Sequence, residues 1–127
     1  MWLTPGVTAL RILLDKNVPV GVHRFLSGHE VRTFVDMHWD PQLENGVLLR
    51  EAEAAGFDVI MTSDQNIAYQ QHLTGRTFAL VVLGSNTWPI VHDDGASIRA
   101  KVEAARPRSY AFIEMPLPPK PQRTVAL

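Results

Sequence analysis

The sequence predicts an α/β domain in three layers, in which a mostly parallel sheet of about four or five strands has helices on both faces. Short apolar runs recur along the chain, with the length and the Val, Ile and Leu content of strands that are buried on both sides. Segments with apolar residues at helical spacing lie between these runs. Because strands alternate with helices, we expect right-handed crossovers that make the strands parallel.

The first elements are a buried strand, a helix and a half-covered strand. Residues 11–15 form an apolar run that ends in an acid, as a central parallel strand does. Pro19 suits the first turn of a helix, and Gly28 suits its end. Residues 30–35, "EVRTFV", alternate as in a strand with one covered face, and a loop is expected after them.

The middle of the chain continues the alternation. Residues 43–55 have the spacing of an amphipathic helix, and Gly56 fits the position just after a helix end. Residues 59–61 form the next buried strand, and a short helix is expected at 66–73.

The last elements follow the same pattern. Residues 77–83, "TFALVVL", predict a buried strand, and 98–105 predict a helix that Pro107 ends. Residues 110–114 predict a final strand at the edge of the sheet. The domain is therefore expected to span 11–115.

Composition places the chain among soluble globular domains. Its 127 residues are 46% apolar and 20% charged, which suits one domain with one core. There is no cysteine, so disulfides and thiolate sites are excluded, and an intracellular, cytoplasmic location is expected. No apolar run approaches the roughly 18 residues of a membrane span. Residues 1–10 lack the pattern of a signal peptide and are expected to be an extension, and the proline-rich residues 116–127 an extended tail.

The charge balance limits the kind of nucleic-acid contact that is expected. Twelve Lys and Arg against thirteen Asp and Glu give a net charge of −1, and no two basic residues are adjacent. A protein that holds a duplex mainly through phosphates usually has a basic excess. Any contact with nucleic acid should therefore be local and modest, and single-stranded RNA is the expected nucleic-acid partner.

Polar side chains follow the apolar run at residues 59–61, in the stretch "DVIMTSDQN". If the strand order is 2-1-3-4, the first and third strands are neighbours where the order reverses, and ligands bind at the carboxyl ends of the strands there. Asp15 ends the first strand and Asp64 follows the third, so both acids should reach the same crevice. Clustered carboxylates repel one another unless a cation or a shared proton intervenes. Oxygen ligands suit Mg²⁺ or Mn²⁺, which can activate a water for attack on a phosphodiester.

Several segments together match a known family pattern over residues 11–88: "ILLDKNVP", "GHEVRT", "LENGVLLREAEAAGFDV", "MTSDQNIAYQQHLTGR" and "VVL". With these segments the chain resembles the small PIN-like proteins known as the DUF5615 or Mut7-C-like group. The resemblance implies a PIN-like fold and the acidic pocket of a metal-dependent ribonuclease. Many members of that group are encoded as candidate toxins of toxin–antitoxin pairs, so an antitoxin protein is an expected partner.

The resemblance assigns catalytic positions residue by residue. Asp15 matches the first acidic position, and Asn17 matches the polar residue beside it. Asp64 matches the acid of a T-x-D motif, preceded by Thr62. Asn45 stands where catalytic PIN domains usually carry a third acid, which predicts a weakened site.

Neighbouring residues complete the expected site. Lys16 replaces the usual Glu and lowers the negative charge further. Glu44 is expected to add a third metal ligand beside Asp15 and Asp64. A substrate is expected to contact Asn17, Thr62, Gln65, Asn66 and Tyr69.

Three other interpretations stay open. Asp15, Asp64 and the asparagines can serve as caps of strands, turns and helices. A PIN-like module without activity could bind RNA or a partner protein. A homodimer is a further partner expectation. A phosphoacceptor receiver domain also carries acids after its first and third strands, and Ser85 or Thr87 together with Lys120 would imitate its remaining residues.

Overall fold

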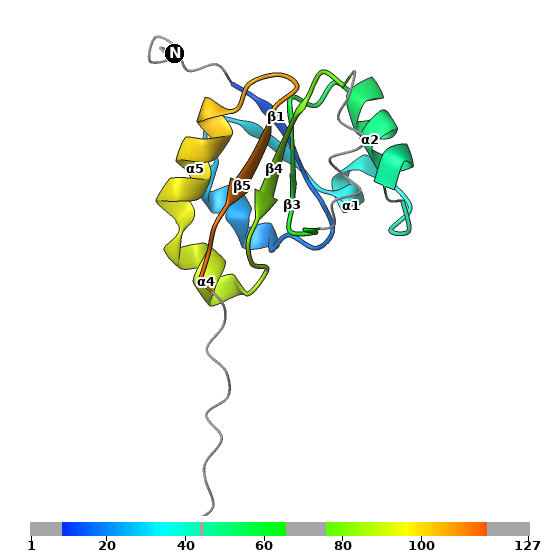
Figure 1. Ribbon diagram of the computed structural model, residues 1–127. Coiled ribbons are helices and arrows are strands. Elements are labelled where there is room, and N and C mark those ends of the chain that lie inside the picture. Colours follow the sequence, from blue (N-terminus) through cyan, green and yellow to red (C-terminus); the bar gives the residue numbers. More distant parts are fainter. Residues whose placement is uncertain (1–8, 44, 66–75, 117–127) are drawn as a thin grey trace, which may run out of the picture.

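Five parallel strands form the central sheet of the protein, in the order β2-β1-β3-β4-β5 (Figure 1). This computed structural model describes residues 9–43, 45–65 and 76–116. The strands are β1 (Arg11–Leu14), β2 (Glu30–Arg32), β3 (Val59–Thr62), β4 (Ala79–Leu83) and β5 (Tyr110–Ile113). The predicted α/β class, the order of the first four strands and the edge position of the last are confirmed.

Helices cover both faces of this sheet, which confirms the three layers (Figure 1). The 3₁₀ helix η1 (Val20–Phe25) and the helices α4 (Trp88–Asp93) and α5 (Gly95–Ala104) pack on one face. The helices α1 (Phe34–Met37) and α2 (Asn45–Ala54) pack on the other. None of the helices described here is long and apolar enough to cross a membrane.

The three central strands are apolar, apart from Arg11 and Thr62 at their ends, because they are covered on both sides. In β1, Ile12 and Leu14 join the core under η1, α4 and α5, while Leu13 joins the core under α2. Leu13 pairs with Ile60 of β3, which pairs with Leu80 of β4, so side chains of one face stay in line across the sheet. Nearly the whole apolar content of these strands is thereby removed from water.

One predicted strand was too long. Residues 30–35 were expected to be extended, yet β2 ends at Arg32 and α1 begins at Phe34. The side chain of Thr33 accepts a hydrogen bond from the Asp36 N–H (3.2 Å), and the Asp36 carboxylate accepts one from the Thr33 N–H (2.9 Å). This reciprocal capping box starts a helix where alternation alone favoured a strand.

The segment after β4 also differs from the prediction. Helix α4 was not predicted, and α5 begins three residues before residue 98, at Gly95. Both helices lie against η1, where glycines allow a close approach: a Cβ on Gly21 would lie 2.4 Å from the Trp88 ring. The expected glycine stop at Gly56 is confirmed, because this residue follows the end of α2 with a φ of +82°. Gly28 also has a positive φ, +90°, but η1 ends earlier, at Phe25. The expected helix at 66–73 lies outside the described residues.

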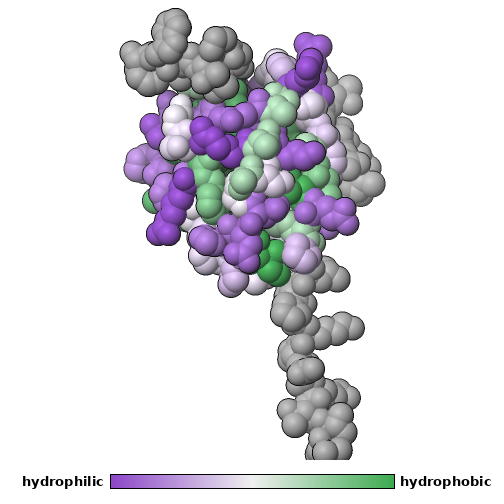
Figure 2. Space-filling view, turned by 90° about the vertical axis from the view of Figure 1, so that its left-hand side faces the viewer, coloured by the Kyte–Doolittle hydropathy of each residue, from purple (hydrophilic) through white to green (hydrophobic). Residues whose placement is uncertain are grey.

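The face that carries α5 is mixed in character. Purple hydrophilic residues are interspersed with green hydrophobic ones there (Figure 2). Such scattered apolar residues are normal for a protein surface.

Helix α2 is joined to the segment that enters β4 by one acidic side chain. The Glu53 carboxylate accepts a hydrogen bond from the Thr77 N–H (2.8 Å) and pairs with the Arg76 guanidinium (3.2 Å). These contacts, the Thr77 hydrogen bond foremost, hold the pKa of Glu53 below its ordinary value of 4.5.

The lowered pKa predicts an acid-dependent contribution to stability. A carboxyl whose pKa is lower in the folded state stabilises the fold above its unfolded pKa, and this contribution is lost as the pH falls through the folded value. Glu53→Gln should therefore lower the Tm by a few degrees at pH 7, and the difference should shrink below the ordinary pKa of 4.5. Thermal unfolding across this pH range measures the effect. Glu51→Gln, at an exposed position of the same helix, is the matched control and should change little.

Candidate functional site

The carboxyl ends of β1 and β3 lie side by side where the strand order reverses. The two strands are parallel neighbours, with Leu14 paired to Met61. The pairing continues one residue further, because the Asp15 N–H donates to the Met61 carbonyl (2.8 Å). Asp15 therefore leaves β1 directly beside the "TSD" segment that leaves β3, as the switch-point argument predicted.

Thr62 connects the two predicted acids. Its hydroxyl donates to Asp15 Oδ2 (2.8 Å) and accepts from the Asp64 N–H (3.0 Å). Asn17 Oδ1 lies 3.3 Å from the same hydroxyl. A hydroxyl has one proton to donate, so the hydrogen bond goes to Asp15, which makes the shorter contact. Thr62 has no exposed surface, so its role in this arrangement is to position Asp15 and the backbone of Asp64.

Asp15 is the most buried acid among the described residues, with 3% of its surface exposed. Oδ2 accepts from the Thr62 hydroxyl, and Oδ1 accepts from the Lys16 N–H (2.8 Å). A buried carboxylate is costly unless hydrogen bonds offset its lost hydration. Both oxygens of Asp15 have such donors, so the fold holds this side chain in one orientation.

Asn17 braces the loops that follow β1 and β3. Its side-chain oxygen accepts from the Ser63 N–H (3.1 Å), and its main-chain carbonyl accepts from the Ser63 hydroxyl (3.0 Å). Ser63 was not among the predicted site residues. The signal that could have found it is its place between Thr62 and Asp64, at the end of a buried strand. Asn17 and Ser63 thus fix the spacing between the two acids.

Lys16 holds a third loop beside Asp15. Its ammonium donates to the Pro41 carbonyl (2.6 Å) and lies 3.5 Å from the Leu43 carbonyl. The Phe34 ring is 5.9 Å away, within reach of a cation–π contact. Lys16 was expected to lower the charge of the pocket, and the structure gives it a further role: it anchors the loop that leads into α2.

The structure describes only some of the other predicted residues. Asp64 is half-buried, and Gln65 is exposed and donates to the Gly84 carbonyl at the end of β4 (3.2 Å). Ser85 follows β4 and accepts from the Thr87 N–H (3.0 Å). Asn45 is the first residue of α2, and only its backbone is described. The remaining predicted residues lie outside the described part of the chain: Glu44, Asn66, Tyr69 and Lys120.

The oxygen atoms of the candidate site are suitable ligands for a hard cation. Every side chain that meets there brings oxygen, from carboxylate, hydroxyl or amide groups, which are the ligands of Mg²⁺ and Mn²⁺. Within residues 9–43, 45–65 and 76–116, no three His, Asp or Glu side chains gather as a metal-binding group. Asp15 and Asp64 would thus be the carboxylate ligands that this part of the chain offers.

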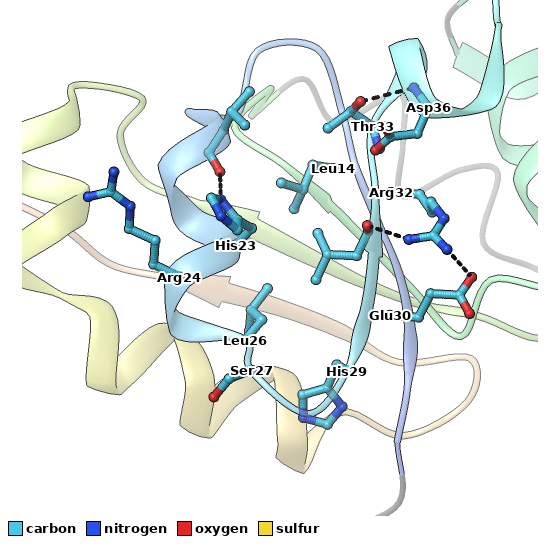
Figure 3. A pocket seen from close by; sticks show the side chains of 12 residues that line it. Leu14, His23, Arg24, Leu26, Ser27, His29, Glu30, Arg32, Thr33 and Asp36 are labelled. Carbon is cyan, nitrogen blue, oxygen red and sulfur yellow. Dashed lines mark hydrogen bonds and ion pairs between the residues drawn. The ribbon is translucent and has the colours of Figure 1, made fainter.

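A cavity of about 600 Å³ opens between η1 and β2 (Figure 3), and neither Asp15 nor Asp64 lines it. A smaller cavity of about 180 Å³ reaches Asp15, and the two share the lining residues Leu14, Val20 and Thr33. In the large cavity His23 and Arg32 already contact main-chain oxygens of Val20 and Val31 (Figure 3). Most of its polar lining residues are thus engaged within the fold, and it is the smaller cavity that adjoins Asp15.

The hydroxyl of Thr62 should contribute more to the free energy of unfolding than its methyl group does. Thr62→Val keeps the shape but leaves Asp15 Oδ2 and the Asp64 N–H without this partner, so it should lower the free energy of unfolding by about 1–3 kcal/mol. Thr62→Ser keeps the hydroxyl and should cost less, about 1 kcal/mol for the lost methyl. Urea unfolding of both variants measures the difference. Equal stability of the two would show that the hydroxyl does not hold the acids in place.

The chain was also compared with known proteins. No protein-family model matches it, and neither a curated protein nor a solved structure matches it.

Proposed function

We propose that the protein is a PIN-like, metal-dependent ribonuclease with a weakened acidic site, and the toxin of a toxin–antitoxin pair. The observation that carries this proposal is the pairing of β1 with β3, which delivers Asp15 and the segment of Asp64 to the two sides of one buried hydroxyl. The Asp15 carboxylate and the backbone of Asp64, from distant parts of the sequence, are held by one hydroxyl whose own hydrogen bonds are satisfied. Such pre-organisation is what a metal or phosphate site requires.

The residues have distinct roles in this proposal. Asp15 and Asp64 would hold a Mg²⁺ or Mn²⁺ ion, which would supply an activated water and stabilise the leaving oxygen. Thr62 holds the Asp15 carboxylate and the Asp64 backbone, and Asn17 holds the Ser63 backbone between them. Asn45 provides a neutral side chain where an acid would strengthen binding, so the affinity for metal should be low. With a net charge of −1, the substrate that fits best is a short single-stranded RNA segment.

A module without activity is the second candidate, and the burial of Asp15 favours it. With 3% of its surface exposed and both oxygens engaged, Asp15 could serve the structure alone. The crevice would then bind RNA or a partner protein and cleave nothing. A receiver domain has less support, because Lys16 stands where a second acid would be needed, and its ammonium binds the Pro41 carbonyl.

An acid in place of Asn45 distinguishes a weakened ribonuclease from a binding module without activity. Asn45→Asp should strengthen Mn²⁺ and Mg²⁺ binding, since an added carboxylate attracts a hard cation. If the protein is a weakened nuclease, this variant should cleave single-stranded RNA about tenfold faster at equal metal concentration. A fluorogenic RNA assay and metal titration measure both effects.

Two controls make the result interpretable. Gln42→Asp adds the same charge at an exposed position of the preceding loop and should change neither property. Asp64→Asn in the Asn45→Asp background should abolish cleavage. A variant that binds metal more tightly and still cleaves nothing would reject the ribonuclease in favour of the binding module.

A second prediction concerns the charge of the crevice without metal. Two carboxylates held close together repel one another, so Asp64→Asn should raise the Tm in the presence of a chelator. The same substitution should remove any increase in Tm that Mn²⁺ gives the wild type. Differential scanning fluorimetry with and without Mn²⁺ measures both changes. A lower Tm in chelator would instead identify Asp64 as a structural cap.

A further inference from the structure

The two edges of the sheet are built differently. At one edge, β2 carries charged residues: Glu30 pairs with Arg11 (2.7 Å) and lies 3.7 Å from Arg32. Charged side chains of this kind keep an edge strand from pairing with another chain. At the other edge, β5 has the sequence Tyr-Ala-Phe-Ile, without charge or proline. Only β5 therefore lacks the usual protection.

The backbone of β5 presents alternate residues to the open edge. The carbonyls of Ser109 and Ile113 accept from Leu80 and Gly84 at the β4 side (2.9 Å each). Because N–H and C=O groups of one residue point the same way in a strand, Tyr110 and Phe112 direct theirs away from β4. No further strand lies beyond β5 among the described residues.

These same two residues are also exposed, although both are large and aromatic. Tyr110 and Phe112 are 39% and 42% exposed, whereas Ala111 and Ile113 pack into the core on the opposite face. Two neighbouring aromatic rings on one face of an open edge are well suited to cross-strand pairing. The occupant should therefore be another strand with complementary side chains.

The sequence of this edge is complementary to itself. Arg108 precedes the strand and Glu114 follows it, both are exposed, and neither joins an ion pair with any described residue. In an antiparallel pair with its two-fold axis at Ala111, Tyr110 lies opposite Phe112 of the second copy. Arg108 then approaches Glu114 of that copy, and each contact occurs twice. Arg108 lies in a turn (φ +64°), and its long side chain provides the reach.

Other registers lose this match. The direction of the backbone groups requires the axis to pass through a residue and not between two residues. An axis at Tyr110 would place Arg108 opposite Phe112, and an axis at Phe112 would place Tyr110 opposite Glu114. Of these three registers, only the one with its axis at Ala111 forms both the aromatic pairs and the charged pairs.

We propose that β5 is a self-association edge, at which two copies of the chain pair antiparallel about Ala111 and join their sheets into one. This proposal is independent of the nuclease proposal, because β5 lies two strands away from β3. Two hydrogen-bonded residue pairs form, because Tyr110 of each copy pairs with Phe112 of the other copy. An interface of this limited size should give a micromolar dimer.

A charge-swap cycle tests the partner and the register at once. The wild type should show a concentration-dependent dimer in sedimentation equilibrium. Arg108→Glu and Glu114→Arg should each weaken it by about tenfold, since like charges then face each other twice. The double variant should restore wild-type affinity, because the complementary pairs are re-formed with reversed signs. Arg106→Glu is the matched control for net charge and should leave the dimer unchanged.

A cross-link gives an independent test. The chain has no cysteine, so Ala111→Cys introduces a single thiol. At a non-hydrogen-bonded antiparallel pair on the axis the two Cα atoms lie about 4.5 Å apart, within the range of a disulfide. Mild oxidation should give a covalent dimer with Ala111→Cys and none with Ser109→Cys, whose two copies would lie far apart along the strands. Circular dichroism confirms that each variant is folded.

Each possible outcome of these experiments either supports or overturns the proposal. Wild-type protein that stays monomeric up to millimolar concentration overturns the proposal and leaves the edge to a strand from a different protein. A dimer that ignores the charge swaps and does not cross-link through Ala111→Cys overturns it as well, since association then uses another surface. Recovery in the double variant supports both the partner and the register.

Discussion

The parallel pairing of β1 with β3 is the constraint on which the rest of the structure depends. It lies at the centre of the sheet, where Leu13 pairs with Ile60 and both faces are covered by helices. Because the pairing is buried, its register cannot slip without moving apolar side chains to the wrong face. The same register brings Asp15 next to the segment 62–64. The candidate site is therefore a consequence of how the core is packed.

Placing an acid at the end of a buried strand has a cost, and the surrounding loops offset it. Asp15 is nearly buried, and it accepts hydrogen bonds from the Lys16 N–H and the Thr62 hydroxyl. Asn17 and Ser63 then hold the two loops together, and Lys16 adds the loop before α2. This network accounts for the polar residues Thr62 and Ser63, which bond to Asp15, to Asn17 and to the Asp64 backbone.

The open edge and the acidic crevice are separate features of one sheet. The crevice uses the ends of central strands, where side chains from both loops converge. The edge uses the unpaired backbone of β5 and the alternation of its side chains. Pairing at that edge would leave the carboxyl ends of β1 and β3 unobstructed by β5 itself. Association and chemistry can thus be measured in separate experiments on the same protein.

The sequence by itself determined the α/β class and the strand order around β1, because periodicity and the handedness of crossovers leave few arrangements. The same order brings Asp15 next to the segment that contains Asp64. The glycine that follows the helical pattern predicted the end of α2 at Gly56. Alternation misled at residues 33–35, since the capping box of Thr33 and Asp36 outweighed it. Only the tertiary structure decided the roles of Ser63, Lys16 and Thr62, because their partners lie far away in the chain. Such contacts depend on how the elements pack, which a local pattern does not contain.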